Sequence, residues 1–495
     1  MSVGALHSLA IWAHIRPEAE AVVDASTGEV LSFAALHGLA RRVAALLARV
    51  RGDEGRFLVF SATTCLPTFV ALHAAILAGI PFLPLHPRLT AGERAAILSF
   101  LGARASDVLD DDALASIFGE ARRLGGPHGV DIDPTPDAAV SPKGVLALLH
   151  TSGTTGIPKL ASLSRRAFAA SAWATTDALQ VVDDDRWLLA LPLCHVGGLS
   201  ILTRSLARGT QVVLLPRFSA AAAVDAIARH GATLFPLVPT MLRDLLQRLP
   251  EGARLPRAVI VGGAGCPSPL LVSCAERGLL ALTTYGLTET CSQVTLQPLR
   301  PPNQRAPGSG VTIRSSNVTI VDAEGRPLGA GETGEIVASG STLFDGYLDA
   351  PAGEGAGEGG AARFATGDFG FLDRDGTLFV EGRRADRIVT GGENVAPTEV
   401  EAAARTARGV RDAVVFGVPD ERWGEAVALC VVAEDPVFDE SALEVSLRAA
   451  LSSFKRPRVF ARIEAVPLTS MGKIDRRAAR ARYSPQVRAF SAKKD

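Results

Sequence analysis

The segment Thr151-Ser-Gly-Thr-Thr-Gly-Ile-Pro-Lys159 follows an apolar run and ends in a lysine. The run before it, residues 145–149 (Val-Leu-Ala-Leu-Leu), predicts a buried strand. Glycines let backbone N–H groups surround an anion closely, and the hydroxyl groups and the lysine add donors and positive charge. A cluster of this composition is more often a flexible loop, but its position after a strand and its terminal lysine favour phosphate binding.

The spacing of this segment differs from that of the Walker loop. The Walker loop places four residues between its glycines and a Ser or Thr after its lysine. Here two residues separate Gly153 from Gly156, and Leu160 follows Lys159. The segment therefore argues against a nucleotide triphosphatase of the Walker class, while it still indicates phosphate chemistry.

Length and composition are those of a globular protein. With 495 residues the chain exceeds one ordinary hydrophobic core, so we expect at least two domains. Apolar residues make up 47%, and a formal net charge of −1 argues against nucleic acid or an anionic membrane as a partner. The sequence has no recognisable signal peptide and no apolar run long enough to span a bilayer, so we expect no membrane insertion. Six cysteines without short paired spacing favour reduced thiols and a cytoplasmic location.

Strands and helices alternate along most of the chain, which predicts an α/β fold with parallel sheets covered on both faces. Between residues 311 and 380, short alternating runs broken by turns predict a β-rich part, with a hairpin turn at Asp375-Gly376. A compact α+β unit follows. We therefore expect a large N-terminal domain over residues 1–384, with its β-rich part at 311–384, and a small mobile C-terminal domain over residues 385–495.

Two further strand-like runs end in glycine- and threonine-rich segments. Residues 258–261 lead into Gly262-Gly263, and residues 279–284 lead into Tyr285-Gly-Leu-Thr-Glu-Thr290. Ligands of open parallel sheets bind beyond the carboxyl ends of the strands. Together with Thr151–Lys159, these segments are expected to converge on one site.

Five segments, taken in order, resemble the motif series of the acyl-adenylate-forming enzymes, which include acyl-CoA synthetases, peptide-synthetase adenylation domains and luciferases. The resemblance covers nearly the whole chain. It implies that a carboxylic acid reacts with ATP to give an acyl-AMP and pyrophosphate, and that a thiol, usually of coenzyme A, then displaces AMP. ATP, Mg²⁺ and coenzyme A are thus the expected cofactors and co-substrates. The segments are Thr151–Lys159, Tyr285–Thr290, Thr366-Gly-Asp368, Gly382-Arg383 with Asp386, and Gly472-Lys473.

The resemblance also implies roles for single residues. Tyr285 would stack on adenine, while Asp368 and Arg383 would bind the ribose hydroxyls. Thr288 would bond a phosphate, and Glu289 would hold Mg²⁺, which prefers carboxylate oxygen. Each residue alone has a plainer interpretation as a core aromatic, a turn aspartate, a surface arginine or a helix cap. The other expected nucleotide-binding residues are Thr151, Ser152, Gly153, Thr154, Thr155, Gly156, Lys159, Gly263 and Gly286.

Lys473 is the expected catalytic lysine of the first half-reaction, although a lysine in a glycine-flanked loop is usually just exposed. In this family such a lysine reaches the α-phosphate and the attacking carboxylate, so the small domain must close over the large one. A second closed arrangement serves thioester formation, and Gly391, Gly392 and Glu393 would then shape the thiol channel. At the family's pivot this chain has Ala385, where a polar residue is common, so no side-chain role is assigned there.

The substrate prediction rests mainly on residues 191–204 (Leu-Pro-Leu-Cys-His-Val-Gly-Gly-Leu-Ser-Ile-Leu-Thr-Arg). This segment resembles the o-succinylbenzoate–CoA ligases of menaquinone synthesis more closely than fatty-acid or acetate enzymes. His195 would line and gate the acyl pocket and take part in catalysis, while a core histidine is the plainer interpretation. Arg204 is a candidate, on charge alone, for binding a second carboxylate, and could equally be a surface residue. The other expected pocket residues are the small ones, Gly198, Gly262 and Ser292.

Other functions stay open at this point. A generic aryl- or medium-chain acyl-CoA synthetase would share the nucleotide residues and differ in the acyl pocket. A domain that acylates a carrier protein is disfavoured, because no carrier unit follows Lys473. A non-catalytic nucleotide-binding homologue would be expected to lack Lys473 or Glu289, and both are present. Homodimers are common in the family, but the sequence carries no interface signature.

Overall fold

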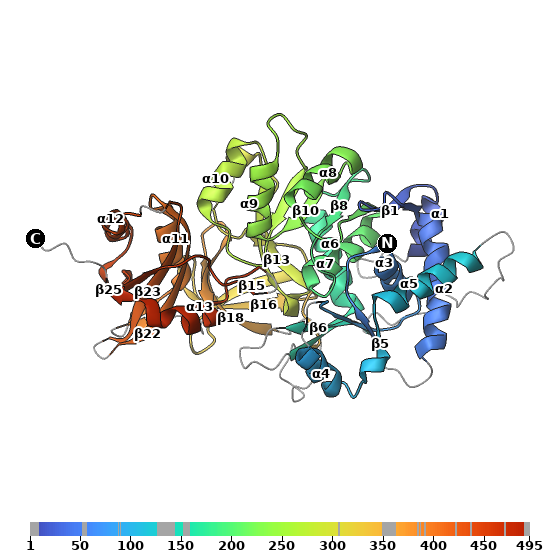
Figure 1. Ribbon diagram of the computed structural model, residues 1–495, viewed down its shortest axis with the longest axis horizontal. Helices are drawn as coiled ribbons and strands as arrows, with labels where there is room; N and C mark the ends of the chain where they lie inside the picture. Colours follow the sequence, from blue (N-terminus) through green and yellow to red (C-terminus); the bar gives the residue numbers. More distant parts are fainter. Residues whose placement is uncertain are drawn as a thin grey trace, which may run out of the picture.

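The protein forms a large and a small lobe (Figure 1). The large lobe holds the N-terminal and central elements, and the small lobe holds the C-terminal elements, coloured orange to red. None of the helices described combines the length and the apolar character needed to cross a membrane. The computed structural model describes residues 9–51, 57–87, 89, 91–125, 144–151, 159–304, 307–348, 363–383, 386, 388–390, 393–420, 423–435, 438–469 and 472–489.

A nine-stranded sheet forms the centre of the large lobe, within the residues described, from β1 (Glu20–Asp24), β2 (Val30–Ser32), β8 (Arg186–Leu189), β9 (Gln211–Leu214), β10 (Leu234–Leu237), β11 (Ala258–Val261), β12 (Ala281–Leu287), β13 (Ser292–Leu296) and β14 (Val311–Thr312). Its six middle strands are parallel, in the order β12-β11-β10-β8-β9-β1. The edge strands β13, β14 and β2 are antiparallel to their neighbours.

A second sheet has six strands in the described part of the chain, namely β3 (Leu58–Ser61), β4 (Phe82–Leu85), β5 (Val108–Leu109), β6 (Val145–Thr151), β7 (Lys159–Ser164) and β17 (Gly346–Tyr347). Strands β6, β4, β3 and β5 are parallel, whereas β7 returns antiparallel to β6 and β17 antiparallel to β7. The short strand β17 brings a distant part of the chain to this edge.

Helices pack between the two sheets and on their outer faces, which gives five layers. The middle layer shares one apolar cluster with both sheets and contains α1 (Leu9–Ile15), α2 (Phe33–Arg51), α3 (Leu66–Leu77), α5 (Asp111–Leu124), α6 (Arg165–Ala178) and α7 (Val196–Arg208). The outer face of the nine-stranded sheet is covered by α8 (Ala220–His230), α9 (Pro239–Arg248) and α10 (Ser268–Glu276), and that of the six-stranded sheet by α4 (Ala91–Phe100). Strands buried on both faces explain the continuous apolar runs of the sequence.

A four-stranded antiparallel sheet makes up the predicted β-rich part, in the order β15 (Ser316–Val321), β16 (Gly334–Gly340), β18 (Arg363–Leu372) and β19 (Leu378–Arg383). The predicted turn at Asp375-Gly376 joins β18 and β19. The carboxylate of Asp373 accepts hydrogen bonds from the backbone of Asp375 and Thr377, and Gly376 has a φ of 77°. This positive φ favours glycine there, so the predicted hairpin is confirmed.

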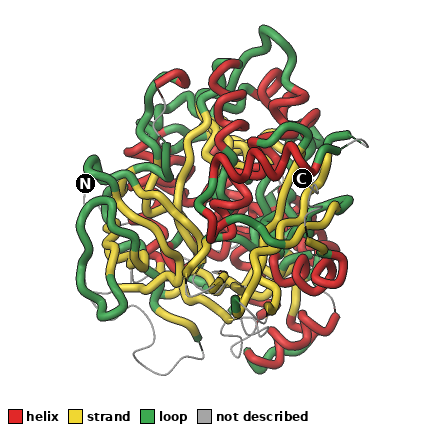
Figure 2. The backbone as a smooth tube through the Cα atoms, turned by 90° about the vertical axis from the view of Figure 1, so that its left-hand side faces the viewer, coloured by secondary structure: helices red, strands yellow, loops and turns green. Residues whose placement is uncertain are grey.

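The small lobe has its own sheet, of β20 (Ile388–Thr390), β21 (Glu393–Val395), β22 (Val410–Asp420), β23 (Gly424–Ala433), β24 (Val459–Arg462) and β25 (Arg488–Ala489). One face packs on α11 (Pro397–Thr406) and α12 (Glu440–Ala450), and the other on α13 (Arg476–Tyr483). Figure 2 views the molecule from the side of this lobe. The boundary between residues 384 and 385 stays a prediction, because both residues lie outside those described.

The predicted α/β fold is confirmed, but the prediction of parallel sheets is wrong at their edges. Seven residues separate β6 from β7, and four separate β12 from β13. Parallel neighbours need a crossover of about a dozen residues or more, so these short connections force antiparallel pairing. Thr151 and Lys159 therefore stand opposite each other at the end of a hairpin.

Candidate active site

The first part of the site is the tight turn after β12. The strand extends through Leu287, so Tyr285 and Gly286 lie within it, and Thr288–Thr290 form a 3₁₀ turn before β13. A Cβ on Gly286 would lie 1.9 Å from the carbonyl oxygen of Ser292, so only glycine fits there. The close approach of β12 and β13 fixes the predicted phosphate and metal residues, Thr288 and Glu289, on this turn.

Tyr285 and Asp368 meet although they lie 83 positions apart in the sequence. Both are buried, and the Tyr285 hydroxyl donates a hydrogen bond of 2.7 Å to Oδ2 of Asp368. Arg383 stands opposite Asp368 in the ladder between β18 and β19. The three residues predicted to bind adenine and ribose therefore lie together, with the backbone alone described for Arg383.

Glu289 and Lys159 share a neighbour that the sequence did not reveal. The hydroxyl of Tyr347 donates a hydrogen bond of 2.6 Å to Oε1 of Glu289. Nζ of Lys159 lies 4.8 Å from the centroid of the Tyr347 ring, within cation–π range. Pairing of β17 with β7 holds Tyr347 in this place. A buried carboxylate beside a lysine suits a magnesium-bound polyphosphate, since Mg²⁺ takes oxygen ligands.

Lys473 comes to the large lobe from the small one. Its Cε would lie 3.8 Å from a Cβ built on Gly263, just beyond the end of β11. The adjacent Gly472, at a φ of 74°, would place a Cβ 3.5 Å from Oγ1 of Thr240 and 3.6 Å from Cγ2 of Val238. In this structure Gly472 and Lys473 therefore lie against the large lobe, as the expected closure of the small domain requires.

His195 is the N-cap residue of α7 and lies next to two other histidines. The centroid of its ring lies 5.6 Å from that of His86 and 5.9 Å from that of His150. Burial, together with the smaller effects of the neighbouring His150, His86 and Lys473, lowers the pKa of His195 to about 3. The ring is therefore neutral at pH 7, which suits a wall of an acyl pocket better than an ion-pair partner.

Arg204 is 1% exposed, so the alternative of a surface residue is wrong. Its Nη2 donates to Oγ of Ser292 at 3.1 Å and also to Oε1 of Gln293, and its guanidinium lies 5.4 Å from the ring centroid of Trp187. Burial lowers the pKa of Arg204 to about 10, so the group stays charged at pH 7. In the described part of the chain it contacts no carboxylate.

The two predicted pocket glycines also serve close packing. A Cβ on Gly198 would lie 2.4 Å from the carbonyl oxygen of Pro192, and one on Gly262 would lie 2.8 Å from Cγ2 of Thr284. Their role as pocket walls stays a prediction. Thr151 ends β6, and its hydroxyl donates weakly to the carbonyl of Lys159 at 3.4 Å.

Several predicted residues are not placed by the structure. The backbone of Glu393 pairs with Thr390 in β21, and its side chain is not described. The remaining ones lie outside the residues described, namely Ser152, Gly153, Thr154, Thr155, Gly156, Gly391 and Gly392.

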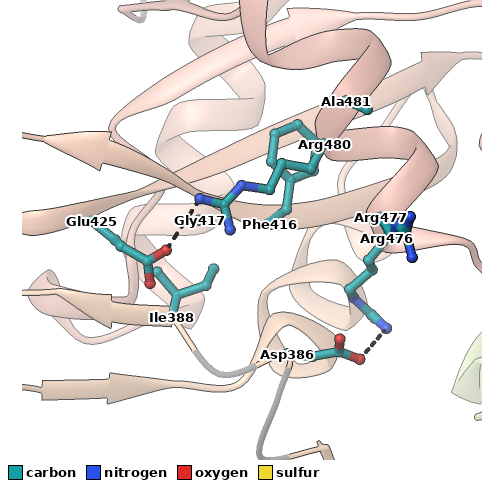
Figure 3. A pocket seen from close by; sticks show the side chains of 9 residues that line it. All are labelled: Asp386, Ile388, Phe416, Gly417, Glu425, Arg476, Arg477, Arg480 and Ala481. Atoms are coloured by element: carbon teal, nitrogen blue, oxygen red, sulfur yellow. Dashed lines mark hydrogen bonds and ion pairs between the residues drawn. The ribbon is translucent and has the colours of Figure 1, made fainter. Parts of the chain in front are cut away.

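The small lobe carries a separate pocket of about 480 Å³ beside α13 (Figure 3). Two ion pairs border it, Arg476 with Asp386 at 3.4 Å and Arg480 with Glu425 at 3.6 Å. Arg476 also makes two hydrogen bonds, of 2.8 and 2.7 Å, to the buried carboxylate of Glu401. Both ion pairs lie within the small lobe itself.

Family models match both lobes. The model described as AMP-binding enzyme matches residues 9–348, and the one described as AMP-binding enzyme C-terminal domain matches residues 399–473. The chain belongs to the AMP-binding enzyme family. The resemblance inferred from five sequence motifs is thereby confirmed, and both AMP-binding segments include residues of the site described above.

Named relatives of this chain are 2-succinylbenzoate–CoA ligases. The 2-succinylbenzoate–CoA ligase of Bacillus licheniformis is 32% identical over 478 residues, which cover 94% of this chain and 97% of the relative. The corresponding ligase of Geobacillus kaustophilus is 32% identical over 472 residues, with 94% and 95% covered.

Two solved structures share this fold over nearly their whole length. One is the o-succinylbenzoate CoA synthetase (MenE) of Bacillus subtilis in complex with the acyl-adenylate intermediate OSB-AMP, with a TM-score of 0.84, 28% identity, and 98% of this chain and 99% of that chain covered. The other is ATP-bound MatB of Rhodopseudomonas palustris, with a TM-score of 0.84, 27% identity, and 97% and 99% covered.

Proposed function

We propose that the protein is an ATP-dependent acid–thiol ligase that converts o-succinylbenzoate to its acyl-AMP and then to its coenzyme A thioester. The observation that carries the proposal is Lys473 of the small lobe, which lies against Gly263 of the large lobe. This arrangement suits the first half-reaction, in which a carboxylate attacks the α-phosphate of ATP. The choice of substrate is supported by relatives named 2-succinylbenzoate–CoA ligase, which this chain matches over almost their full length.

The nucleotide end of the site would work mainly by position and charge. Tyr285 and Asp368 hold the nucleoside, and Lys159 meets the phosphates that leave as pyrophosphate. Mg²⁺, held at Glu289, would neutralise phosphate oxygens. Lys473 supplies a cation where negative charge gathers between the attacking carboxylate and the α-phosphate, and such preorganised charge is the main requirement of phosphoryl-type transfer.

The acyl end of the site would select a dicarboxylic aromatic acid. Neutral His195 offers the flat face of a ring without a competing charge. Arg204 is too deeply buried to reach the substrate directly, but it donates to the hydroxyl of Ser292, which is only half-buried. We propose that Ser292 binds the second carboxylate, with Arg204 behind it to supply the positive potential.

Thioester formation would follow rotation of the small lobe, which removes Lys473 and brings Gly391, Gly392 and Glu393 to the thiol path. A place in menaquinone synthesis, a cytoplasmic location and a homodimeric state stay predictions of the same proposal. Coenzyme A is the proposed thiol, because the relatives are named as CoA ligases.

The decisive experiment is a panel of carboxylic acids assayed for ATP- and Mg²⁺-dependent pyrophosphate release, followed by thioester formation with coenzyme A. We expect o-succinylbenzoate to give the highest kcat/KM, well above benzoate and medium-chain fatty acids. If another acid ranks first, the named substrate is wrong and the acid–thiol ligase reaction stands. If no acid releases pyrophosphate, the whole proposal fails.

A further inference from the structure

Two histidines and one cysteine form a cluster at the proposed acyl pocket, and no joint role has been assigned to the three side chains so far. His86, Cys194 and His195 each offer one ligand atom, and these atoms all lie within 4.8 Å of one another. His86 is 6% exposed and Cys194 is fully buried. The cluster joins the end of the six-stranded sheet, after β4, to the start of α7.

The donor atoms of this cluster suit a borderline-soft cation. Imidazole nitrogen and thiolate sulfur are the usual ligands of Zn²⁺, whereas Mg²⁺ takes oxygen. Zn–S bonds of about 2.3 Å and Zn–N bonds of about 2.0–2.1 Å place the ligand atoms of a tetrahedral site about 3.4–3.6 Å apart. Closing the observed spacing therefore needs side-chain movements of about one ångström.

A second observation is that Nε2 of His195 is buried and has no hydrogen-bond partner among the residues described. The same holds for Nε2 of His150, whose ring stands next to that of His195. A buried polar atom without a partner costs free energy, and a bound metal would relieve that cost at His195.

We propose that His86, Cys194 and His195 form an inhibitory Zn²⁺ site at the acyl pocket. Zinc binds the three side chains, Cys194 as the thiolate, and the thiol proton leaves to solvent without any redox change. The fourth position is left to water. Because ligation fixes His195 and places a cation beside Lys473, zinc competes with the carboxylic acid substrate and opposes the arrangement of the first half-reaction.

The test measures zinc binding by the whole protein without reference to activity. The metal-free protein is titrated with Zn²⁺ against a chromophoric chelator, and with Co²⁺ to look for a thiolate-to-cobalt absorption band. We expect one bound Zn²⁺ per chain, an affinity at least about tenfold weaker in Cys194→Ser and in His86→Gln, and no cobalt–thiolate band in Cys194→Ser. Cys274→Ser, another buried cysteine distant from the cluster, is the matched control and should bind like the wild type.

The inhibitory part has its own readout. Zinc should raise the KM for the acid in the wild type and in Cys274→Ser, with millimolar Mg²⁺ unable to prevent it, and should have little effect on Cys194→Ser. Absence of one-to-one binding, or unchanged binding in both Cys194→Ser and His86→Gln while they fold normally, overturns the site. Binding without any rise in KM overturns the inhibition.

Discussion

Arg204 in the large lobe and Arg476 in the small lobe are both largely withdrawn from solvent, but their partners differ in kind. Arg476 is 17% exposed and bonds two carboxylates, those of Glu401 and Asp386. Arg204 is 1% exposed and bonds the neutral side chains of Ser292 and Gln293. A buried charge without a counter-ion is costly, whereas a fully paired one supports the local structure.

This difference in partners indicates that Arg476 stabilises the fold, whereas Arg204 contributes to a binding site. The network around Arg476 ties the segment after β19, through Asp386, to the start of α13, three residues beyond Lys473. It ties the chain that follows Lys473 to the rest of the small lobe. The charge of Arg204 is left unneutralised by the described residues, and the proposed dicarboxylate would supply the missing negative charge.

The largest expected effect comes from breaking the paired arginine. Arg476→Met leaves the carboxylate of Glu401 buried beside Arg405 alone, and removal of one partner from a buried pair costs about 3–5 kcal/mol. The free energy of unfolding of the small lobe, measured by urea denaturation, should fall by this amount. Arg477→Met, at the exposed neighbouring arginine, should change it by less than about 0.5 kcal/mol. Similar losses in both variants would contradict a structural role specific to Arg476.

Removal of Lys473 tests a cation that is proposed to stabilise the negative charge that develops during the first half-reaction. Lys473→Ala should lower the rate of acyl-adenylate formation by about 10²–10³-fold, the usual loss for one donor aimed at developing negative charge. Thioester formation from supplied acyl-AMP should be largely spared, because the lobe has then rotated away. Pre-steady-state pyrophosphate release and thioester formation are measured separately. Equal loss of both half-reactions would rule out the rotation.

Arg204→Met tests the unpaired side of the comparison. We expect the KM for o-succinylbenzoate to rise about tenfold or more, because Ser292 loses the positive potential behind its hydrogen bond to the carboxylate, and a hydrogen bond to a charged group contributes about 1.5–3 kcal/mol. The KM for a monocarboxylic aromatic acid should change far less. Because a general loss of folding would affect both acids alike, the ratio of the two KM values isolates the effect on the second carboxylate. Ser292→Ala should give the same ratio change. A uniform change for both acids would show that Arg204 only supports the fold.

The smallest expected effect on stability concerns His73. This residue shows a third way to accommodate a buried titratable group, which is to keep it neutral. It lies fully buried on α3 against the edge of Phe69, and burial lowers its pKa to about 3. Below pH 6.5 the unfolded chain binds a proton that the folded protein refuses, so stability falls as the pH drops from about 6.5 towards 3. One such group makes the protein about 1.4 kcal/mol less stable at pH 5.5 than at pH 8.

His73→Leu should remove that increment from the pH dependence of the unfolding free energy. Denaturation is compared at pH 8 and pH 5.5 in the wild type and the variant. An unchanged pH dependence would mean that His73 takes up its proton in the folded state.

The sequence was informative about local structure and motif residues, and less so about partners that meet only in three dimensions. Apolar runs located the strands within a few residues, because buried strands need them. Motif resemblance pointed to Tyr285, Glu289 and Lys473. The contact of Glu289 with Tyr347 joins residues 58 positions apart, and it depends on the short strand β17 pairing with β7. No local pattern marks such a contact.

The burial of Arg204 was also beyond the sequence. An arginine on a helix predicts an exposed or snorkelling side chain, because arginine is rarely buried. Tertiary packing places the partners of Arg204. Gln293 on β13 accepts its hydrogen bond and also accepts one from Thr175 on α6. The burial of Arg204 therefore becomes visible only when α6, α7 and β13 are packed together.

The chain has three tyrosines, and two of them donate their hydroxyl groups to carboxylates of the proposed nucleotide site. The third, Tyr483, donates to the carbonyl of Ala465 within the small lobe. A protein carrying isotope-labelled tyrosine rings would thus give a very simple NMR spectrum. Two of its ring signals would shift when nucleotide and metal bind at the site, and the third would report on the small lobe. One sample would thus report on both lobes without any added probe.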